Sequence, residues 1–305
     1  MQSGELSATA NCRAGHQSIL NSRVTMIKNL FQWLGLSPRD VYRQNQSLIL
    51  VNGLAEQGES WYPNRGVWQQ QYNVHTPGVI VYGGQVMQDR LAARQPIDIQ
   101  FLTDRLGQFL DQFVQAPPYH LVASSLGGQL AIEYAARHPE KVGKIVLLCP
   151  SGFGTEEKLP ITEGARHKNY QGLVESTFYD RNQASPRIVK YYEQKFACKR
   201  WRRALFETVR GTKSHSVRPK LPLVEAPTLV ICGREDRIVD PQGVREAVEG
   251  LSNFEYVLLP RCGHAPQLER PQLINRMVLD FLNAPHTMPA PRAMNAALAG
   301  GLASG

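Results

Sequence analysis

Short apolar runs alternate along the chain with longer stretches whose apolar residues recur at helical spacing. Runs bounded by turn residues predict buried strands, and six of them fall at Ser47–Val51, Gly78–Tyr82, Leu121–Ala123, Lys144–Cys149, residues 226–233 and Tyr256–Leu259. Two amphipathic helices are predicted between them, at Gln129–Ala136 and Pro96–Gln115. Strands that alternate with helices imply an α/β fold with a mostly parallel sheet. In such sheets functional residues gather beyond the carboxyl ends of the strands.

One internal segment interrupts the alternation. Residues 151–222 hold aromatic and basic side chains without a clear strand pattern, so they divide the predicted core into residues 46–150 and 223–283. Most of these aromatic side chains are expected to form the inner packing of the segment itself.

The two ends of the chain depart from the pattern as well. Residues 1–45 form an N-terminal extension with a predicted helix over Val24–Leu36, for which docking on the core is preferred to contact with a membrane surface. A natural start at Met26 stays open. Residues 284–305 are rich in alanine, proline and glycine and are expected to be disordered.

Composition places the chain among globular enzymes. It has 305 residues, 42% hydrophobic and 20% charged, and no run approaches the roughly 18 to 20 apolar residues that span a bilayer. The first 23 residues lack the apolar centre of a secretory signal. Five cysteines without metal-ligand spacing favour a reducing cytoplasm. We therefore expect a cytoplasmic protein without a metal or cofactor.

A net charge of +8 raises the question of anionic partners. The densest basic cluster surrounds Trp201 and comprises Lys195, Lys199, Arg200, Arg202 and Arg203. We interpret it as a solvated helix face, with peripheral contact to an anionic membrane as the alternative. No nucleic-acid-binding motif accompanies the charge, so no nucleic-acid partner is expected.

The residues around Ser125 predict a nucleophile. The strand Leu121–Ala123 leads almost directly into a helix at this serine, which is the pattern of a nucleophile elbow, a strained turn that exposes the hydroxyl. Such a turn needs small neighbours, and Ala123 lies two residues before Ser125 and Gly127 two residues after it. Ser124 does not fit the same position, because its neighbours at that spacing are bulky.

Asp236 and His264 are the predicted acid and base. Asp236 follows the strand at 226–233, and His264 follows the strand Tyr256–Leu259. A serine hydroxyl is a weak nucleophile until a histidine takes its proton, and a carboxylate fixes the imidazole tautomer. The chain order Ser, Asp, His at three strand ends therefore predicts a catalytic triad. Asp240 is a rival for the acid.

From about residue 46 to residue 283 the chain resembles the α/β-hydrolase superfamily, in particular its serine esterase and monoacylglycerol-lipase-like branch. The resemblance rests on the elbow, on the order of the triad, and on Asp236 in the family's Gly-x-x-Asp position after Gly233. This position favours Asp236 over Asp240. The implied fold is an α/β-hydrolase fold with a helical cap, residues 151–222, inserted before the acid-bearing strand.

The resemblance also implies an oxyanion hole made of two backbone N–H groups. One belongs to Leu54, after the strand Ser47–Val51 and Asn52-Gly53, and the other to Leu126, directly after the nucleophile. Asn52 stands where the family usually has histidine, a difference that leaves both backbone donors in place. Phe153, close to the end of a strand, is the candidate for a wall of the substrate pocket.

These residues favour hydrolysis of a small-molecule carboxylic ester through an acyl-enzyme. Carbon–carbon hydrolases, which also carry Cys-Gly-His at the position of Cys262 to His264, remain an alternative, as do thioesterases. A ligand receptor that retains the triad is the alternative of another class. Families with an aspartate nucleophile do not match Ser125. The natural substrate, the acyl chain length and the oligomeric state stay open.

Overall fold

The computed structural model describes residues 46–56, 58–114, 117–154 and 157–285. The predicted N-terminal helix, the question of Met26 and almost all of the predicted C-terminal tail lie outside these residues.

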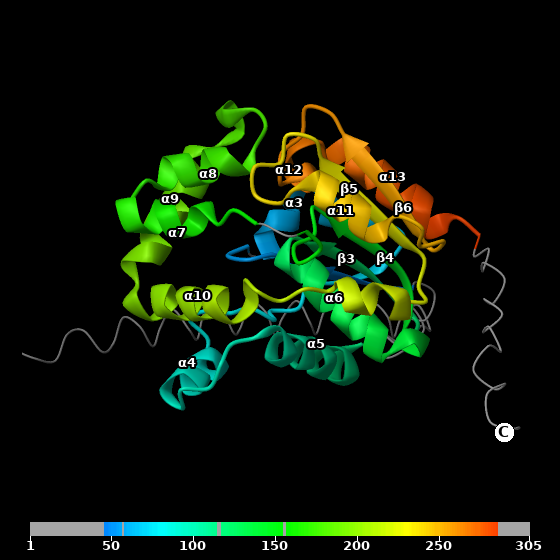
Figure 1. The fold of residues 1–305 in the computed structure, drawn as a ribbon, viewed down its shortest axis with the longest axis horizontal. Helices are drawn as coiled ribbons and strands as arrows, with labels where there is room; N and C mark the ends of the chain where they lie inside the picture. Colours follow the sequence, from blue (N-terminus) through cyan, green and yellow to red (C-terminus); the bar gives the residue numbers. More distant parts are fainter. Residues whose placement is uncertain (1–45, 57, 115–116, 155–156, 286–305) are drawn as a thin grey trace, which may run out of the picture. The chain divides into compact units, whose positions relative to one another are not determined.

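The core is a six-stranded parallel sheet in the order β2-β1-β3-β4-β5-β6 (Figure 1). Five predicted strands are confirmed with boundaries moved by a few residues. The strands are β1 Ser47–Val51, β2 Asn73–His75, β3 Tyr119–Ser124, β4 Val142–Leu148, β5 Thr228–Gly233 and β6 Phe254–Leu259.

The predicted strand at Gly78–Tyr82 is wrong. The edge strand β2 lies earlier, at Asn73–His75, where it pairs with Ser47–Ile49 of β1. Pro77 follows it and has no backbone N–H for a sheet ladder. The next residues form a loop in which Val79 and Tyr82 are buried, so the apolar run reflects loop packing.

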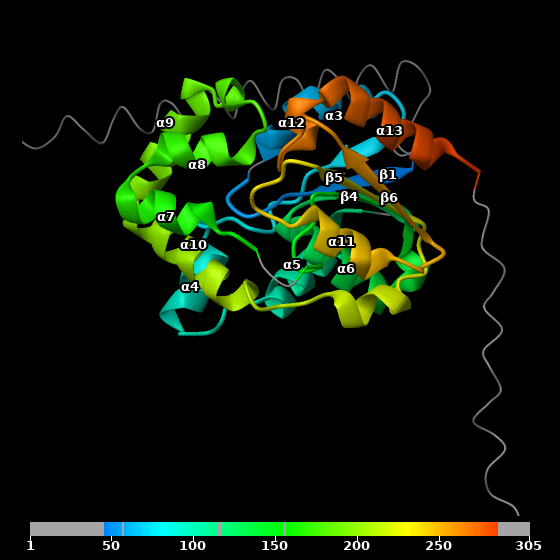
Figure 2. The same ribbon diagram turned by 45° about the horizontal axis from the view of Figure 1, so that its top comes forward.

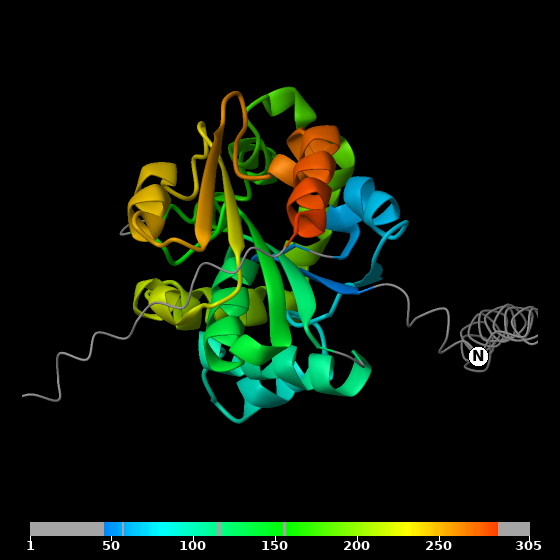
Figure 3. The ribbon, with the colours of Figure 1, turned by 90° about the vertical axis from the view of Figure 1, so that its right-hand side faces the viewer.

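Helices cover both faces of the sheet. On one face, α3 Tyr62–Trp68 and α13 Pro271–Asn283 pack against alternate residues such as Leu48 and Leu50. On the other, α5 Ile99–Phe113, α6 Leu126–Arg137 and α11 Pro241–Val248 pack against Ile49 and Val51. The alternation follows from the two-residue period of side chains along a strand. Figures 1, 2 and 3 show this layered arrangement.

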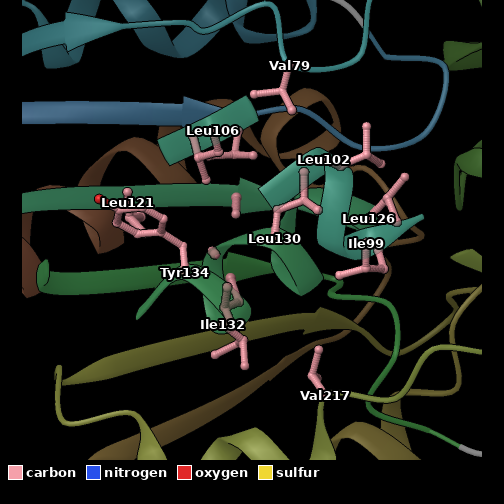
Figure 4. Packing of buried hydrophobic residues seen from close by; sticks show 14 of the residues in the cluster. Val79, Ile99, Leu102, Leu106, Leu121, Leu126, Leu130, Ile132, Tyr134 and Val217 are labelled. Carbon is pink, nitrogen blue, oxygen red and sulfur yellow. The ribbon is translucent and has the colours of Figure 1, made fainter. Parts of the chain in front are cut away.

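The predicted helix at Pro96–Gln115 is confirmed as α5, and the helix after the elbow as α6. The Asp98 side chain caps α5 by accepting a hydrogen bond from the Phe101 N–H at 2.9 Å. Figure 4 shows Leu102 and Leu106 of α5 beside Leu130 of α6, inside the larger core cluster. This packing holds the N-terminal end of α6, and therefore the elbow, against the sheet.

Among the described residues, four α-helices lie between β4 and β5, where a helical insertion was expected. They are α7 Pro160–His167, α8 Tyr170–Thr177, α9 Pro186–Ala197 and α10 Lys199–Thr212, and we call them the cap. Figures 1 and 2 show them grouped on one side of the sheet. Phe178, Phe196 and Trp201 are at most 5% exposed, so these aromatic side chains are inner packing, as the sequence indicates.

The remaining helices are short connections. They are η1 Gly58–Trp61, α4 Gln85–Ala92, η2 Pro139–Lys141, η3 Arg181–Gln183, η4 Arg218–Leu223 and α12 Pro266–Glu269. Within the described part of the chain, none of the helices has the length and apolar character needed to cross a bilayer.

Candidate active site

Ser125 lies at a sharp turn between β3 and α6. Its φ is +48° and its ψ −118°, a conformation that side-chain-bearing residues rarely adopt. A Cβ on Gly127 would collide with the carbonyl oxygen of Val51, so a small residue is needed there. Ser125 lines a cavity, whereas Ser124 is fully buried and donates its hydroxyl to Glu56 at 2.8 Å. The geometry therefore favours the predicted register over the one centred on Ser124.

His264 and Asp236 meet at the carboxyl ends of β5 and β6. The Nδ1 atom of His264 lies 2.8 Å from Oδ2 of Asp236, and the side chains are 8% and 1% exposed. The other carboxylate oxygen of Asp236 accepts hydrogen bonds from the N–H groups of Ile238 and Val239, at 2.8 and 3.1 Å. Asp236 is thus held on both oxygens, and His264 lines the same cavity as Ser125.

Asp240, the rival acid, has a structural contact instead. It caps α11 by accepting hydrogen bonds from the N–H groups of Gln242 and Gly243, at 3.0 and 3.1 Å. Its side chain is occupied by a helix end and is exposed. Asp236 alone of the two contacts the histidine.

In the loop from Asn52 to Glu56, which we call the oxyanion loop, two N–H groups on either side of Leu54 donate to side chains. The Gly53 N–H donates to Glu56 at 2.9 Å and the Ala55 N–H donates to the Tyr82 hydroxyl at 3.1 Å. Leu54, between them, has no acceptor for its N–H among the described residues, and it lines the cavity. The N–H of Leu126, at the first turn of α6, likewise has no acceptor there. These are the two predicted oxyanion donors.

The cavity enclosing these groups has a volume of about 110 Å³, and we call it the catalytic cavity. Besides the predicted residues, its lining includes cap side chains from α7, α8, α9 and α10, among them Ile161, Leu173, Tyr192 and Val209. The lining is mostly apolar. A flexible apolar group such as an acyl chain fits these walls.

Phe153 does not line this cavity, contrary to the expectation from sequence. It is fully buried in the larger core cluster, and the Arg218 guanidinium donates to its carbonyl at 2.7 Å. It follows β4 by a few residues, and its ring packs within that cluster. The pocket walls come from cap helices that start at residue 160.

Neighbouring carboxylates influence the protonation of His264. Burial alone lowers the pKa of His264, but the adjacent Asp236 carboxylate, with Glu56 and Glu157 further away, outweighs it and raises the pKa above its ordinary value. Burial tends to raise the pKa of Asp236, but His264 and two backbone N–H groups lower it overall. The pair therefore favours a carboxylate beside an imidazole that accepts a proton readily.

Sequence reasoning missed two acidic residues of the cavity, Glu56 and Glu157. Burial raises the pKa of both carboxyls, although backbone N–H donors and His264 act in the opposite direction. Glu56 stands two residues after Leu54, the predicted oxyanion donor, and a carboxyl so close to the end of a buried strand was the available signal. Glu157 gave no comparable signal, because only its packing brings it to the cavity.

The loop that carries His264 is joined to the cap. The His264 N–H donates to the carbonyl of Thr177 at 2.8 Å. The Glu269 carboxylate accepts from the Gly263 N–H and from the Tyr179 N–H of the cap, both at 2.8 Å. His264 is thus positioned by contacts with the core and with the segment of residues 177–179 together.

A buried thiol, that of Cys149, lies near Asp236 and His264. Ligand atoms of Cys149, Asp236 and His264 lie within 4.8 Å of one another, which is the spacing of a metal site. Burial raises the pKa of the Cys149 thiol well above its usual range, so the thiolate that binds metal is disfavoured. Asp236 and His264 are already paired. The donor set fits a hydrogen-bonded pair with a neutral neighbour better than a metal centre.

The chain is similar in sequence to known proteins. The sequence profile described as "Alpha/beta hydrolase family" matches residues 48–277. Human monoacylglycerol lipase ABHD6 is 27% identical over 203 residues, 60% of each chain. A 2-hydroxy-6-oxononadienedioate/2-hydroxy-6-oxononatrienedioate hydrolase from Paraburkholderia xenovorans is 31% identical over 180 residues, 53% of this chain and 61% of that one. The chain thus matches about three fifths of the length of these relatives.

Solved structures agree in fold. A serine hydrolase from Cycloclasticus zankles superposes with a TM-score of 0.67 at 19% identity, over 79% of this chain and 91% of that one. A 2-hydroxy-6-oxo-6-phenylhexa-2,4-dienoate hydrolase from Rhodococcus gives a TM-score of 0.66 at 23% identity, over 79% and 92%.

Proposed function

The chain belongs to the alpha/beta hydrolase family, and from this premise we propose that it hydrolyses a carboxylic ester through an acyl-enzyme, with Ser125, His264 and Asp236 as its triad. One observation carries the proposal. Ser125 and a His264 paired with Asp236 at 2.8 Å line the same cavity as two backbone residues, Leu54 and Leu126, whose N–H groups have no acceptor among the described residues.

The proposed reaction has two halves. The Ser125 hydroxyl attacks the ester carbonyl while His264 takes its proton, and the tetrahedral oxyanion accepts hydrogen bonds from Leu54 and Leu126. His264 then returns the proton to the leaving alcohol, and the acyl group stays on Ser125. Water attacks the acyl-enzyme with His264 again as the base, which releases the acid and restores the serine.

The charges of the catalytic cavity favour a substrate that is uncharged around the reacting bond. Its partly buried charged side chains are the acidic Glu56 and Glu157, whereas its basic ones, Lys158 and Lys213, are exposed. A carboxylate on the substrate would lie near two partly buried carboxyls, whereas the cationic groups of the lining are exposed to solvent. An ester with a mainly apolar acyl group, of the kind that the name of the human relative indicates, avoids this cost.

Labelling and turnover together test the proposal. A fluorophosphonate probe should label the folded protein, peptide mapping should place the adduct on Ser125, and p-nitrophenyl butyrate should be turned over many times. Stoichiometric acylation without turnover would indicate a ligand receptor. Faster cleavage of a thioester, or of a ring-fission dienoate, than of matched esters would assign the alternative hydrolase classes.

We also propose peripheral contact with anionic membrane surfaces. The support is the exposed basic face of α10, where Lys199, Arg200 and Arg203 are exposed. Such a face attracts acidic headgroups at low ionic strength.

A further inference from the structure

Glu56 lies beside the reacting groups, yet the proposed mechanism gives it no step. Both of its carboxylate oxygens accept a hydrogen bond. Oε2 accepts from the Gly53 N–H at 2.9 Å, and Oε1 accepts from the Ser124 hydroxyl at 2.8 Å. Gly53 belongs to the oxyanion loop after β1, and Ser124 is the last residue of β3, directly before the nucleophile. One side chain therefore joins the two halves of the oxyanion hole.

The oxyanion loop lies directly on the nucleophile at this point. A Cβ on Gly53 would be 2.8 Å from Oε1 of Glu56 and 3.0 Å from Cβ of Ser125. Only a residue without a side chain leaves room for both neighbours. Since Leu54 follows Gly53 directly, any movement of Gly53 changes the distance between the Leu54 N–H and Ser125.

We propose that Glu56 is a positioning residue that fastens the oxyanion loop to the nucleophile elbow through Gly53 and Ser124, and that its carboxylate also acts on His264, which lines the same cavity. The inference rests on the proposed ester hydrolysis. It assigns two separable effects to one side chain, one through hydrogen bonds and one through charge.

The hydrogen bonds act on the transition state. The oxyanion forms only when the serine attacks, so a misplaced Leu54 N–H weakens the transition state more than substrate binding. Removal of one oxyanion donor lowers kcat by about 100- to 1000-fold in comparable sites. A loosened donor retains part of its effect, so the loss on removing the Glu56 carboxylate should be about 10- to 100-fold.

The charge acts on the base. The groups that face His264 are the carboxylates of Asp236, Glu56 and Glu157 and the neutral Cys149 thiol. Glu56 itself is faced by His264 and by the tyrosines Tyr82 and Tyr192. Lys195 shares with Glu56 the lining of a second cavity of about 350 Å³. Because a carboxylate favours the imidazolium, removing it lowers the pKa of His264.

Two variants of Glu56 separate these effects. Glu56→Gln keeps an oxygen for the Gly53 N–H and an amide beside Ser124, but removes the charge, so kcat on the pH plateau should stay within about threefold. The acid limb of its kcat/KM profile should move to lower pH. Glu56→Ala removes hydrogen bonds and charge, so its plateau kcat should fall about 10- to 100-fold with a smaller change in KM.

Ser124→Ala is the matched control. It breaks the bond from the elbow to Glu56 but leaves the carboxylate, so kcat should fall while the acid limb stays near its wild-type position. Thermal melts identify any variant that fails to fold. If Glu56→Ala or Ser124→Ala does not fold, the pH profile of Glu56→Gln alone tests the inference. An unchanged acid limb in Glu56→Gln, or wild-type kcat in folded Glu56→Ala, overturns the inference. Absence of fluorophosphonate labelling at Ser125 in the wild type would instead overturn the proposed ester hydrolysis.

Discussion

At the scale of single residues, the backbone of Ser125 is held in a conformation that costs folding free energy. The φ of +48° and ψ of −118° put it among strained non-glycine residues, whose cost is about 1 to 3 kcal/mol. Glycine adopts positive φ without a steric penalty. The placement of the hydroxyl at the catalytic cavity thus comes with a stability cost that a substitution can relieve.

Ser125→Ala and Ser125→Gly form a matched pair that tests this strain. Both variants should lose fluorophosphonate labelling and at least about 1000-fold of ester turnover, because both lack the nucleophile. Ser125→Gly should nevertheless be more stable than Ser125→Ala, by about 1 kcal/mol in urea unfolding. Equal unfolding midpoints would show that the elbow is relaxed.

The two aspartates near the end of β5 should respond differently to the same change. Asp236→Asn leaves His264 without the acceptor that fixes its tautomer, so kcat should fall by about 10⁴-fold. Asp240→Asn preserves a good N-cap for α11, so kcat and stability should stay near those of the wild type. Steady-state kinetics on p-nitrophenyl butyrate measure both variants. A large loss in Asp240→Asn with a rate near wild type in Asp236→Asn would show that the acid is assigned wrongly.

The pH dependence of the reaction follows from the raised pKa of His264. The base must be neutral to accept the serine proton, and Asp236, opposing the effect of burial, raises its pKa above 6.5. Activity is complete above the raised pKa and is lost as the pH falls through it. We expect the acid limb of kcat/KM above pH 6.5, measured in buffers of constant ionic strength. A rate that stays flat down to pH 5 would contradict a histidine base.

At the scale of elements, we expect cap residues to determine substrate selectivity and core residues to determine stability. Leu173 of α8 lines the catalytic cavity, whereas Phe153 is core. Leu173→Ala should change the ratio of kcat/KM for butyrate and octanoate esters by about tenfold, because each methylene in an apolar pocket is worth about 1 to 3 kcal/mol. Phe153→Ala is the control.

The control variant should show the opposite pattern. Phe153→Ala opens a cavity in packed core and should cost about 3 to 5 kcal/mol of unfolding free energy, while the ester preference of the folded fraction stays at the wild-type value. A shifted preference in this variant, with an unchanged one in Leu173→Ala, would return the pocket wall to Phe153.

Strands with continuous apolar runs could be predicted from sequence, whereas a segment that is buried by loop packing could not be distinguished from them. β1, β3, β4, β5 and β6 have continuous apolar runs because both faces of a parallel sheet are covered. Gly78–Tyr82 has the same composition, but Tyr82 is buried against Trp201 of the cap, with ring centroids 5.1 Å apart. A local pattern cannot distinguish burial in a sheet from burial beneath a cap.

At the scale of the whole molecule, the convergence of Ser125, Asp236 and His264 at one edge of the sheet could be predicted, because parallel strands of one sheet end at the same edge. Glu56 was not singled out, because its contacts with Gly53 and Ser124 depend on the register of two neighbouring strands. The pocket wall was placed wrongly for a related reason. Cap residues reach the cavity through the packing of four helices, which no spacing in the sequence encodes.

The basic face of α10 belongs to this scale as well. The wild type should sediment with vesicles of phosphatidylglycerol but not with those of phosphatidylcholine, and binding should weaken from 50 to 300 mM salt. A variant with Lys199, Arg200 and Arg203 each changed to glutamate should lose sedimentation while it keeps turnover of soluble esters. Equal binding to both lipids would contradict the proposed electrostatic contact.

The bonds from the His264 loop to the cap restrict how this protein can be re-engineered. Thr177 offers a carbonyl to His264, and Tyr179 offers an N–H to Glu269, which also holds Gly263. A transplanted cap from a relative would have to present the same two backbone groups at the same place, or the general base would lose its support. Libraries that vary α7, α9 and α10 while they retain the residues from Thr177 to Tyr179 can therefore explore new substrates without dismantling the machinery that cleaves them.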